Sequence, residues 1–422
     1  MQFRTTAGRL GPAVTAVLAV TALGAGTLAT APTAVAATAA VPLTIDQADV
    51  PAVAEIDKTN GRVTMEWTLS RGDANLDVTI THVATGKKIT QRLTAPHHST
   101  VFSFTWKPLF EEQESPDSLA EVDAPNGAYT VAVKATPDAG GGTPAYKTSK
   151  MSIARAFNPH DFNDNGSTDV LARDSSGDLW RSDLKDRAYY GDIRLAKTTR
   201  IGSGWGVYKQ IEAVGNIAGG KHGDLIALDG FGVLWHYQGK GDGGFATRVR
   251  VGSGWGGYNK LAGGSDLNGD GRPDLVATDG TGTLWFYKGT GSSTAPFASR
   301  VKVGGGWGVY NHLTAVGNIA GTSAGDLVAR DTSGVLWLYQ GNGSGKFDTR
   351  VQIGGGWGVY RQLVGSGDLD NDGRPDLIAY GTSGQHGSYV YRSTGSTEAA
   401  TPFNRRLTDL YGYQGRSYSI VA

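Results

Sequence analysis

A repeat of about 50 residues restricts the fold of this 422-residue chain more than any other feature. Four near copies of one segment read "TRIGSGWGVYKQI" (199–211), "RVRVGSGWGGYNKL" (248–261), "RVKVGGGWGVYNHL" (300–313) and "RVQIGGGWGVYRQL" (350–363). Their tryptophans, Trp205, Trp255, Trp307 and Trp357, are 50, 52 and 50 residues apart. A second series, Trp180, Trp235, Trp285 and Trp337, keeps the same period. Such a period with several short β segments per unit is typical of β-propeller blades.

One unit contains four candidate strands, separated by turns rich in Asp, Asn and Gly. They are Tyr258–Ala262, Asp274–Thr278, Thr283–Lys288 and Arg300–Val303. A linear solenoid is the alternative, but it would need polar capping units at its ends. The ends favour a closed ring instead, because an acidic half-unit occurs five times and the Gly-Trp half only four times. The acidic halves lie around Asp169, Asp224, Asp274, Asp326 and Asp376.

The C-terminal tail supplies a degenerate fifth Gly-Trp half. Phe403 aligns with Phe245, Phe297 and Phe347, which places Tyr413 at the Trp position. The last strand would then complete the first blade and remove an open sheet edge. The predicted fold is therefore all-β, with a five-bladed propeller over residues 156–422.

Residues 45–155 lack this period and form a separate predicted domain. Alternating runs such as "RVTMEWTLS" (62–70) and "AYTVAVKAT" (128–136) predict a small antiparallel β-sandwich of immunoglobulin type. The segment "NGAYTVAVKATPDAGG" (126–141) resembles the closing hairpin of FlgD-type immunoglobulin-like domains of secreted bacterial proteins.

The first 36 residues are predicted to be a signal peptide. Arg4 and Arg9 precede an apolar run that ends at Ala34-Val35-Ala36, an A-x-A cleavage signal. A membrane anchor is the alternative, but Gly, Thr and Pro interrupt the run and no basic stop-transfer cluster follows. Residues 37–44 would form a loose N-terminal segment. We therefore expect a secreted protein with no membrane span after cleavage.

Charge and cysteine content exclude several classes of site. Of 39 basic residues, Arg4 and Arg9 leave with the signal peptide, so 37 basic and 39 acidic side chains remain. Without a basic patch, nucleic acid is not an expected partner. The chain has no Cys, which excludes disulfides and thiolate metal sites.

Three loops carry oxygen-bearing side chains at alternate positions, followed by a glycine and a further Asp. The clearest, "DLNGDGRPD" (266–274), offers Asp266, Asn268, Asp270, the carbonyl of Arg272 and Asp274. The equivalent sets are Asp161, Asn163, Asn165, the carbonyl of Ser167 and Asp169, and Asp368, Asp370, Asp372, the carbonyl of Arg374 and Asp376. Ca²⁺ takes such oxygen ligands. An EF-hand would need Glu at position 12, where all three loops have Ala.

These loops resemble the calcium loops of FG-GAP (VCBS-type) repeats. The resemblance implies a propeller with three Ca²⁺ ions, which we expect to be structural, and the first loop, with fewest charges, should bind most weakly. Blades two and four keep only Asp224 and Asp326, so we expect no ion there. The alternative is a network of Asx turns without metal.

No catalytic motif is present, and nearly interchangeable repeats do not provide the unique residue set that catalysis needs. We therefore predict that the protein is not an enzyme. Repeated equivalent sites suit a multivalent binder, whose avidity can exceed single-site affinity by roughly 10²–10⁴.

The Gly-Trp turns are the candidate ligand sites. Their Trp and Tyr side chains either pack between blades or stack on sugar rings, and the sequence leaves both interpretations open. The pairs are Trp205 and Tyr208, Trp255 and Tyr258, Trp307 and Tyr310, and Trp357 and Tyr360. Turn and period resemble tachylectin-type five-bladed lectins, which bind N-acetylated sugars between blades but lack the acidic loop.

The predicted function is calcium-stabilised binding of cell-wall or surface glycans. The alternative is a protein-interaction module that regulates or anchors another secreted protein, or a subunit of an extracellular assembly. The sequence does not indicate the oligomeric state.

Overall fold

The computed structural model describes residues 41–94, 99–115, 118–138, 142–187, 192–370, 372–381, 387–396, 400–404, 410 and 417–422. Every regular element among them is a β-strand or a short 3-10 turn, which confirms the all-β class. The predicted signal peptide and Tyr413 lie outside these residues. None of the described segments forms a helix long and apolar enough to cross a membrane.

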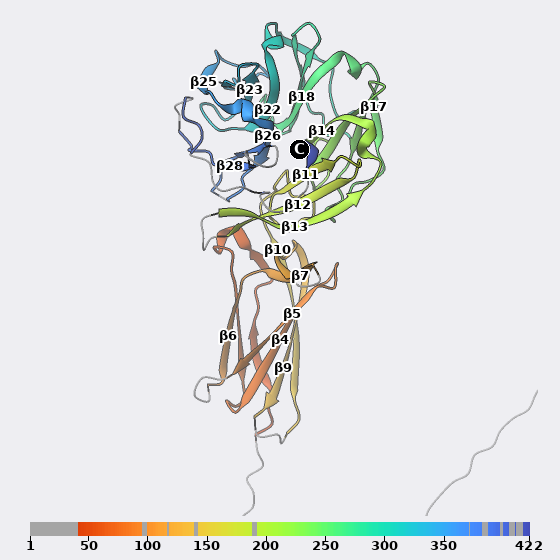
Figure 1. Ribbon diagram of the computed structural model, residues 1–422. Coiled ribbons are helices and arrows are strands. Elements are labelled where there is room, and N and C mark those ends of the chain that lie inside the picture. The colour runs from red at the N-terminus through yellow and green to blue at the C-terminus, as the bar shows by residue number, and fades with distance from the viewer. Residues whose placement is uncertain are drawn as a thin grey trace, which may run out of the picture. The chain divides into compact units, whose positions relative to one another are not determined.

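The N-terminal strands form two larger sheets and one hairpin (Figure 1). The first sheet has the order β1-β3-β6 and the second β2-β10-β9-β4-β5, while β7 pairs with β8. The bounds are β1 (Ile45–Asp49), β2 (Val53–Glu55), β3 (Val63–Leu69), β4 (Ala74–His82), β5 (Lys88–Thr94), β6 (Val101–Trp106), β7 (Leu109–Ser115), β8 (Ser118–Asp123), β9 (Gly127–Pro137) and β10 (Ala145–Ala154), with a 3-10 turn, η1, at Ile56–Lys58. The pairing of β2 with β10 is parallel, so the antiparallel prediction is wrong at this edge.

The two larger sheets share one hydrophobic core. In β4 every second side chain is buried, as alternation in the sequence predicts for a half-buried strand. Trp67 of β3, Phe102 of β6, Leu76 of β4 and Val131 of β9 belong to the same buried cluster. The immunoglobulin type and the FlgD likeness stay predictions.

The repeat region contains five sheets among the described residues, which we call blades one to five. Blade one has the order β13-β12-β11-β29, blades two to four run β14 to β17, β18 to β21 and β22 to β25, and blade five has β26-β27-β28. The bounds in blade one are β11 (Asp169–Asp174), β12 (Leu179–Arg187), β13 (Asp192–Gly202) and β29 (Tyr418–Val421).

In blade two they are β14 (Tyr208–Gly215), β15 (Asp224–Asp229), β16 (Leu234–Tyr237) and β17 (Val249–Gly252), and in blade three β18 (Tyr258–Ser265), β19 (Asp274–Asp279), β20 (Leu284–Tyr287) and β21 (Val301–Gly304). Blade four has β22 (Tyr310–Gly317), β23 (Asp326–Asp331), β24 (Leu336–Tyr339) and β25 (Val351–Gly354), and blade five β26 (Tyr360–Gly367), β27 (Asp376–Gly381) and β28 (Tyr389–Tyr391). The four strands predicted within blade three are confirmed.

The first strands of neighbouring blades lie side by side. β14 contacts β18, β18 contacts β22, and β22 contacts β26. The C-terminal strand β29 pairs with β11 and contacts both β14 and β26, so the predicted return of the chain end to the first blade is confirmed. Phe403 also keeps its predicted place, because its bridge to Ser393 matches those of Phe245, Phe297 and Phe347.

Glycine is required at the turn before each repeated tryptophan. Gly204, Gly254, Gly306 and Gly356 have φ between 84° and 89°, a left-handed conformation that a side chain would strain. A 3-10 turn follows in each case: η3 (Trp205–Val207), η4 (Trp255–Gly257), η5 (Trp307–Val309) and η6 (Trp357–Val359). The Gly-Trp motif is thus a backbone requirement of the crossover between blades.

The boundary predicted between residues 155 and 156 stays a prediction. Internal contacts group Pro42–Ala422 into one unit. Asn126 joins the two regions by donating its backbone N–H to the carbonyl of Asp164 at 2.6 Å.

Removing residues 417–422 is expected to expose the edge of β11 and the cavity left by Tyr418, whose side chain is buried. An open strand edge templates intermolecular pairing, so the truncated protein should aggregate and melt at a lower temperature. Light scattering after size exclusion and a thermal melt measure both effects. Adding the peptide SYSIVA in trans should restore the monomer, whereas a truncated protein that stays monomeric with an unchanged melting temperature would refute closure by β29.

Candidate functional site

The three predicted calcium loops share one pattern of hydrogen bonds. Their first carboxylates are those of Asp161, Asp266 and Asp368, and each accepts backbone N–H groups four and five residues later. The donors are Asn165 (3.1 Å) and Gly166 (2.6 Å), Asp270 (3.0 Å) and Gly271 (2.7 Å), and Asp372 (3.1 Å) and Gly373 (2.7 Å). The N–H groups of Ser167, Arg272 and Arg374 donate in turn to the side chains of Asn165, Asp270 and Asp372.

This is the Asx-turn network that the sequence offered as the alternative to a metal. It does not decide between the two interpretations, because a carboxylate oxygen that accepts one hydrogen bond keeps a lone pair for an ion.

The last aspartate of each loop has a structural role in all five blades. Asp169, Asp224, Asp274, Asp326 and Asp376 are fully buried at the start of a strand. In Asp274 one oxygen accepts the Leu267 N–H at 3.0 Å, and the other accepts the Gly289 N–H at 2.8 Å beyond the third strand. Asp224, Asp326 and Asp376 make the equivalent pairs of bonds. The carboxylate therefore ties loop to strand end, which explains why blades two and four keep it.

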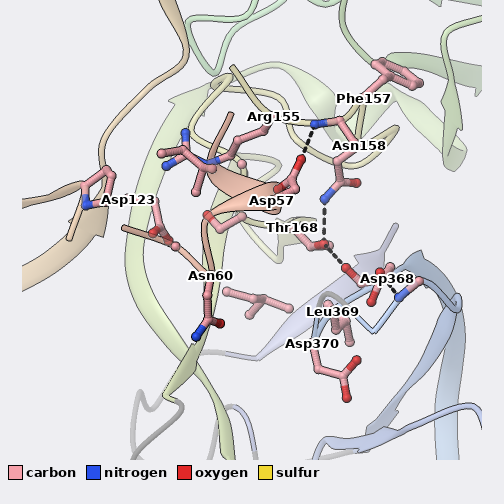
Figure 2. A pocket seen from close by; sticks show the side chains of 18 of the residues that line it. Asp57, Asn60, Asp123, Arg155, Phe157, Asn158, Thr168, Asp368, Leu369 and Asp370 are labelled. Carbon is pink, nitrogen blue, oxygen red and sulfur yellow. Dashed lines mark hydrogen bonds between the residues drawn. The ribbon is translucent and has the colours of Figure 1, made fainter. Parts of the chain in front are cut away.

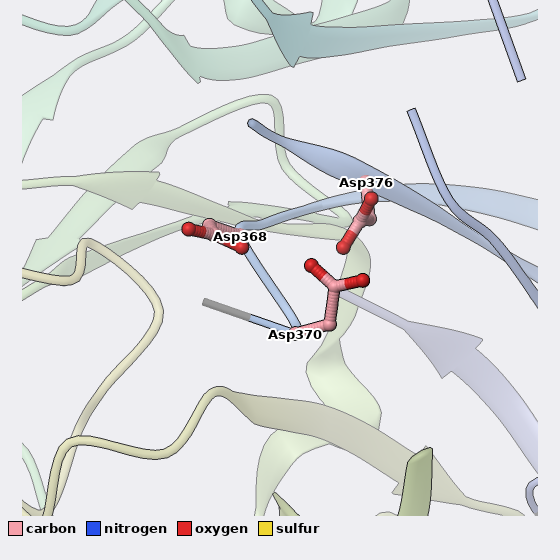
Figure 3. A group of neighbouring side chains, drawn as sticks. All are labelled: Asp368, Asp370 and Asp376. Carbon is pink, nitrogen blue, oxygen red and sulfur yellow. The ribbon is translucent and has the colours of Figure 1, made fainter. Parts of the chain in front are cut away.

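Loop five (368–376) has the donor set that best fits a divalent cation. Asp368, Asp370 and Asp376 each place an oxygen within 4.8 Å of the other two (Figure 3). Oδ1 of Asp370 is buried and has no hydrogen-bond partner among the described residues, while its Oδ2 lies 3.0 Å from Arg392 Nε. Burial, together with the charges of Asp370 and Asp368, raises the pKa of Asp376 to about 7. A Ca²⁺ ion would relieve this crowding of carboxylates.

Loop three (266–274) fits an ion after two rearrangements. The Asn268 amide nitrogen donates to both oxygens of Asp274, at 3.0 and 2.8 Å, so its oxygen would have to turn inward. Asp270 Oδ2 pairs with Lys288 Nζ at 2.8 Å, and that lysine is half exposed and free to withdraw. Burial raises the pKa of Asp274 to about 7, with Asp270 and Asp266 adding to the effect.

Loop one (161–169) already contains a cation. Arg181 of β12 is buried, with its Nε 3.3 Å from Asp169 Oδ1 and its Nη2 3.2 Å from Asp183 Oδ2. Asn163 donates to Asp183 at 2.7 Å. The predicted third ion therefore stays a prediction that this geometry disfavours.

The eight predicted ligand-binding aromatics are all buried. Trp205, Trp255, Trp307 and Trp357 are 6–8% exposed, and Tyr208, Tyr258, Tyr310 and Tyr360 are 2–8% exposed. Each tryptophan packs on a tyrosine from the third strand of the next blade, with ring centroids 4.4–4.7 Å apart. Packing between blades, which the sequence left open as an alternative, describes these contacts. Stacking on sugar stays an untested prediction that would require the rings to become exposed.

The second tryptophan series is more exposed, but in three of its four members an arginine lies over one face of the ring. The guanidinium carbons of Arg248, Arg300 and Arg350 lie 4.1, 4.0 and 4.0 Å from the ring centroids of Trp235, Trp285 and Trp337. The indole N–H groups donate to Asp229, Asp279 and Asp331.

A cavity of about 630 Å³ lies where loop five meets the N-terminal region (Figure 2). Its lining combines an aromatic ring, amides and charged groups: Asp57, Asn60, Lys107, Asp123, Arg155, Phe157, Asn158, Thr168, Asp368 and Asp370. Phe157 is 55% exposed, the largest exposure of any aromatic ring in this lining. Among the described residues, the side chains of Asn60 and Lys107 have no hydrogen-bond or ion-pair partner, so they are available to a ligand.

Sequence reasoning missed this cavity, because its residues come from four separate segments of the chain. Two of them lie side by side: Thr168 Oγ1 donates to the Asp368 carbonyl at 3.3 Å, and Asn158 Nδ2 donates to Thr168 Oγ1 at 2.9 Å. The only local signal is Asn60, a non-glycine residue with φ of 52°. Such residues are uncommon and cluster at functional sites.

A second, axial cavity of about 30 Å³ lies among the first strands of the blades. Glu212, His160 and His312 line it, at positions where the repeats differ from one another. Burial raises the pKa of Glu212 to about 8 and lowers those of His160 and His312 to about 4. All three side chains are thus mainly uncharged at neutral pH. The volume holds about one water molecule, which is too small for an organic substrate.

Comparison with known proteins identifies the repeat. A family model described as FG-GAP-like repeat matches residues 266–327 and 324–379, which include loops three and five. Together with the successive four-stranded sheets, this match supports a repeat β-propeller. A search of curated proteins finds no match.

Solved structures give only distant matches. One is a lectin from Agrocybe aegerita that recognises non-reducing terminal N-acetylglucosamine (16% identity, 83% of this chain and 93% of that chain, TM-score 0.35). Another is the six-bladed β-propeller lectin of Aleuria aurantia, which recognises fucose (9% identity, 88% and 96%, TM-score 0.33). A third is Sqt1 from Chaetomium thermophilum bound to the N-terminus of ribosomal protein L10 (11% identity, 87% and 86%, TM-score 0.29). At these identities and TM-scores we base no functional argument on the likeness.

Chelation of calcium is expected to lower the melting temperature. An ion that binds only the folded state stabilises it by about 2.7 kcal/mol at a hundredfold excess over Kd. Asp370→Ala should remove the ion of loop five and Asp270→Ala that of loop three, each counted by isothermal titration calorimetry. Asp242→Ala, an exposed acid in blade two, is the control and should change neither quantity. A melting curve indifferent to chelator would refute bound calcium.

Glu212 should make stability depend on pH. Because its pKa is raised from 4.5 to about 8, the folded state retains a proton that the unfolded state loses, so the free energy of unfolding falls as pH rises between these values. Glu212→Gln removes this loss, and its stability relative to the native protein should increase by about 1–3 kcal/mol from pH 5 to pH 8. Scanning calorimetry at several pH values measures the difference. Thr314→Val, in the same cavity, should shift stability by a pH-independent amount, and an equal slope for both variants would contradict the prediction.

Proposed function

We propose that this protein is a secreted, non-catalytic carbohydrate-binding β-propeller, with its principal ligand site in the 630 Å³ cavity beside loop five. The observation that carries the proposal is the lining of that cavity, in which an exposed aromatic ring, Phe157, shares the space with the side chains of Asn60 and Lys107, which have no protein partner among the described residues. We further propose that the five sheets form one five-bladed ring and that calcium in loops three and five stabilises it.

The cavity has the chemistry that sugar recognition needs. A pyranose offers an apolar C–H face and a ring of hydroxyl groups that both donate and accept hydrogen bonds. Phe157 supplies an apolar surface, Asn60 supplies a donor and an acceptor, and Lys107 supplies donors. The volume lies within the 300–1,000 Å³ typical of small-molecule sites, enough for a mono- or disaccharide.

The geometry suits binding more than catalysis. Asp57 Oδ2 accepts the Ala156 N–H at 2.6 Å, so one candidate acid is fixed as a structural acceptor. Asp368 accepts two backbone N–H groups of its own loop, and Asp370 pairs with Arg392. The carboxylates are thus committed to the fold or to an ion rather than poised for proton transfer.

Burial of the Trp and Tyr rings disfavours multivalent binding at the Gly-Trp turns. A chain with one site can still bind a polymeric glycan with avidity when several copies act together. The number of sites per chain should therefore be measured with the sugar that binds.

Binding of a protein is the second candidate, and one observation favours it. Phe231, at the turn after β15, is 96% exposed, and Val207 beside it is 57% exposed. The Gly230 N–H donates to the Val207 carbonyl at 3.2 Å, which joins these two turns. Equivalent turns carry Ser or Thr at the position of Phe231, so this ring is specific to blade two.

A glycan array probed with the mature protein is expected to show binding that a free monosaccharide competes away. Phe157→Ala should weaken that binding about tenfold, equivalent to ~1.4 kcal/mol, by removing the apolar surface under the sugar. Asn60→Gly, which removes the side chain and tolerates the φ of 52°, should weaken it as well without a large change in the melting temperature. Calorimetry with the competing sugar gives affinity and number of sites.

Phe231→Ala is the matched control, because it removes an exposed ring elsewhere. It should leave sugar binding unchanged. A silent array, or an array signal that Phe157→Ala does not alter, would refute the assigned site. A protein captured by the native chain and lost with Phe231→Ala would favour the second candidate.

A further inference from the structure

Loop one differs from loops three and five in what neutralises its buried acids. Arg181 and Asp169 are both buried, with 9% and 0% of their side chains exposed, and they form an ion pair at 3.3 Å. The same guanidinium donates from Nη2 to Asp183 at 3.2 Å. A planar guanidinium with five N–H donors can bridge two carboxylates in this way and stays charged at any physiological pH.

The strand register shows that blade one differs from blades three and five at two positions of the third strand. Arg181 pairs with Leu171 in blade one, as Phe286 pairs with Val276 in blade three and Val390 with Ile378 in blade five. The residue that faces the loop is therefore apolar where an ion is proposed and cationic here.

Two residues further along β12 the charge is reversed as well. Asp183 stands where blades three and five have Lys288 and Arg392. Those two cations pair with loop acids Asp270 and Asp370 from outside the loop. In blade one the cation, Arg181, is two residues earlier on the strand than Lys288 and Arg392 are, and an acid, Asp183, occupies their position.

Most polar groups on the remaining side chains of loop one have protein partners, although Asn163 Oδ1 is buried without one. Asn163 Nδ2 donates to Asp183 Oδ1 at 2.7 Å, so its amide nitrogen points where a metal ligand would present oxygen. Asp164 accepts two bonds from Asn126 of the N-terminal region, at 2.6 Å to its carbonyl and 2.8 Å to its side chain. A Cβ on Gly166 would lie 2.1 Å from Arg155 Cδ, which shows how closely the N-terminal region covers the loop.

We propose that the guanidinium of Arg181 takes the place of the ion in loop one, and that this metal-free loop anchors the N-terminal region to the ring whether or not calcium is present. An ordered loop suits this role, because the contact with Asn126 needs the left-handed backbone of Asp164, at φ of 57°. Loops three and five, whose cations lie outside, would remain the calcium-dependent part of the ring.

The first test counts ions. Calorimetric titration of the calcium-free protein should give two equivalents of Ca²⁺ per chain, and three equivalents would overturn the proposal. This count depends on the proposed calcium binding by loops three and five, whereas the second test does not.

The second test uses Arg181→Met, which keeps an unbranched apolar stem and removes the charged guanidinium. In chelator the variant should melt roughly 5–15 °C below the native protein, because Asp169 and Asp183 are left buried without a cation. With those acids released, the variant should also gain calcium-dependent stability and one additional equivalent of Ca²⁺. Arg181→Lys keeps a cation and should retain two equivalents with a smaller loss.

Arg330→Met is the matched control, because Arg330 is as buried as Arg181 but bonds to backbone carbonyls of Trp357 and Tyr360. It should lose stability equally with and without calcium and gain no ion. Equal behaviour of the two Met variants would overturn the proposal. If the native chain binds no calcium, the calcium proposal fails by itself, and a calcium response confined to Arg181→Met would still support the role of Arg181. If Arg181→Met does not fold, the native count and the Arg181→Lys count decide.

Discussion

The buried aspartate that opens the second strand of each blade is the interaction on which the rest of the repeat depends. In blades two to five its two oxygens accept N–H groups from the preceding loop and from the residue beyond the third strand, so one side chain fixes three segments of the meander. In blade one Asp169 accepts the loop N–H with one oxygen and faces Arg181 with the other. Placing a carboxylate at 0% exposure is costly, and burial raises the pKa of Asp326 to about 6 even though three backbone N–H groups oppose the shift. Five such sites explain why the loops are where the blades differ most.

The groups that lie beside this buried aspartate differ from blade to blade. Blade one has a buried arginine, and blade two has His236, with Nε2 3.4 Å from Asp224 Oδ2. Blade four relies on backbone N–H groups alone, with Leu338 facing the same aspartate region. Blades three and five add further acids, which makes the charge problem worse unless a cation is bound. A donor set that is unfavourable by itself is what a binding site for a divalent ion looks like before the ion arrives.

The sequence predicts correctly those features that recur with the 50-residue repeat. The strands of a blade, the return of the last strand to β11, and the place of Phe403 all follow from repeat alignment, because equivalent residues must occupy equivalent positions in stacked units. The parallel pairing of β2 with β10 carries no such signal, since β2 has only three residues and lies outside the repeat. The role of Arg181 could not be read from loop one either, because the departure lies on the opposite strand and only the register brings the two together.

Burial of the repeated tryptophans indicates where a ligand site can lie in a repeat protein. Residues that recur in every unit are those that every unit needs, and here Trp255 and its equivalents fill the space between neighbouring sheets. Ligand chemistry must then come from positions at which the units differ or at which another segment joins them. The 630 Å³ cavity meets both conditions, because Thr168 of blade one lies beside Asp368 of blade five, and Asp57 of the N-terminal region accepts a hydrogen bond from the Ala156 N–H of the linking segment. A ligand held there would contact the two ends of the ring and the N-terminal region together. Its binding energy would therefore add to closure of the fold, which couples recognition to the stability of the whole chain.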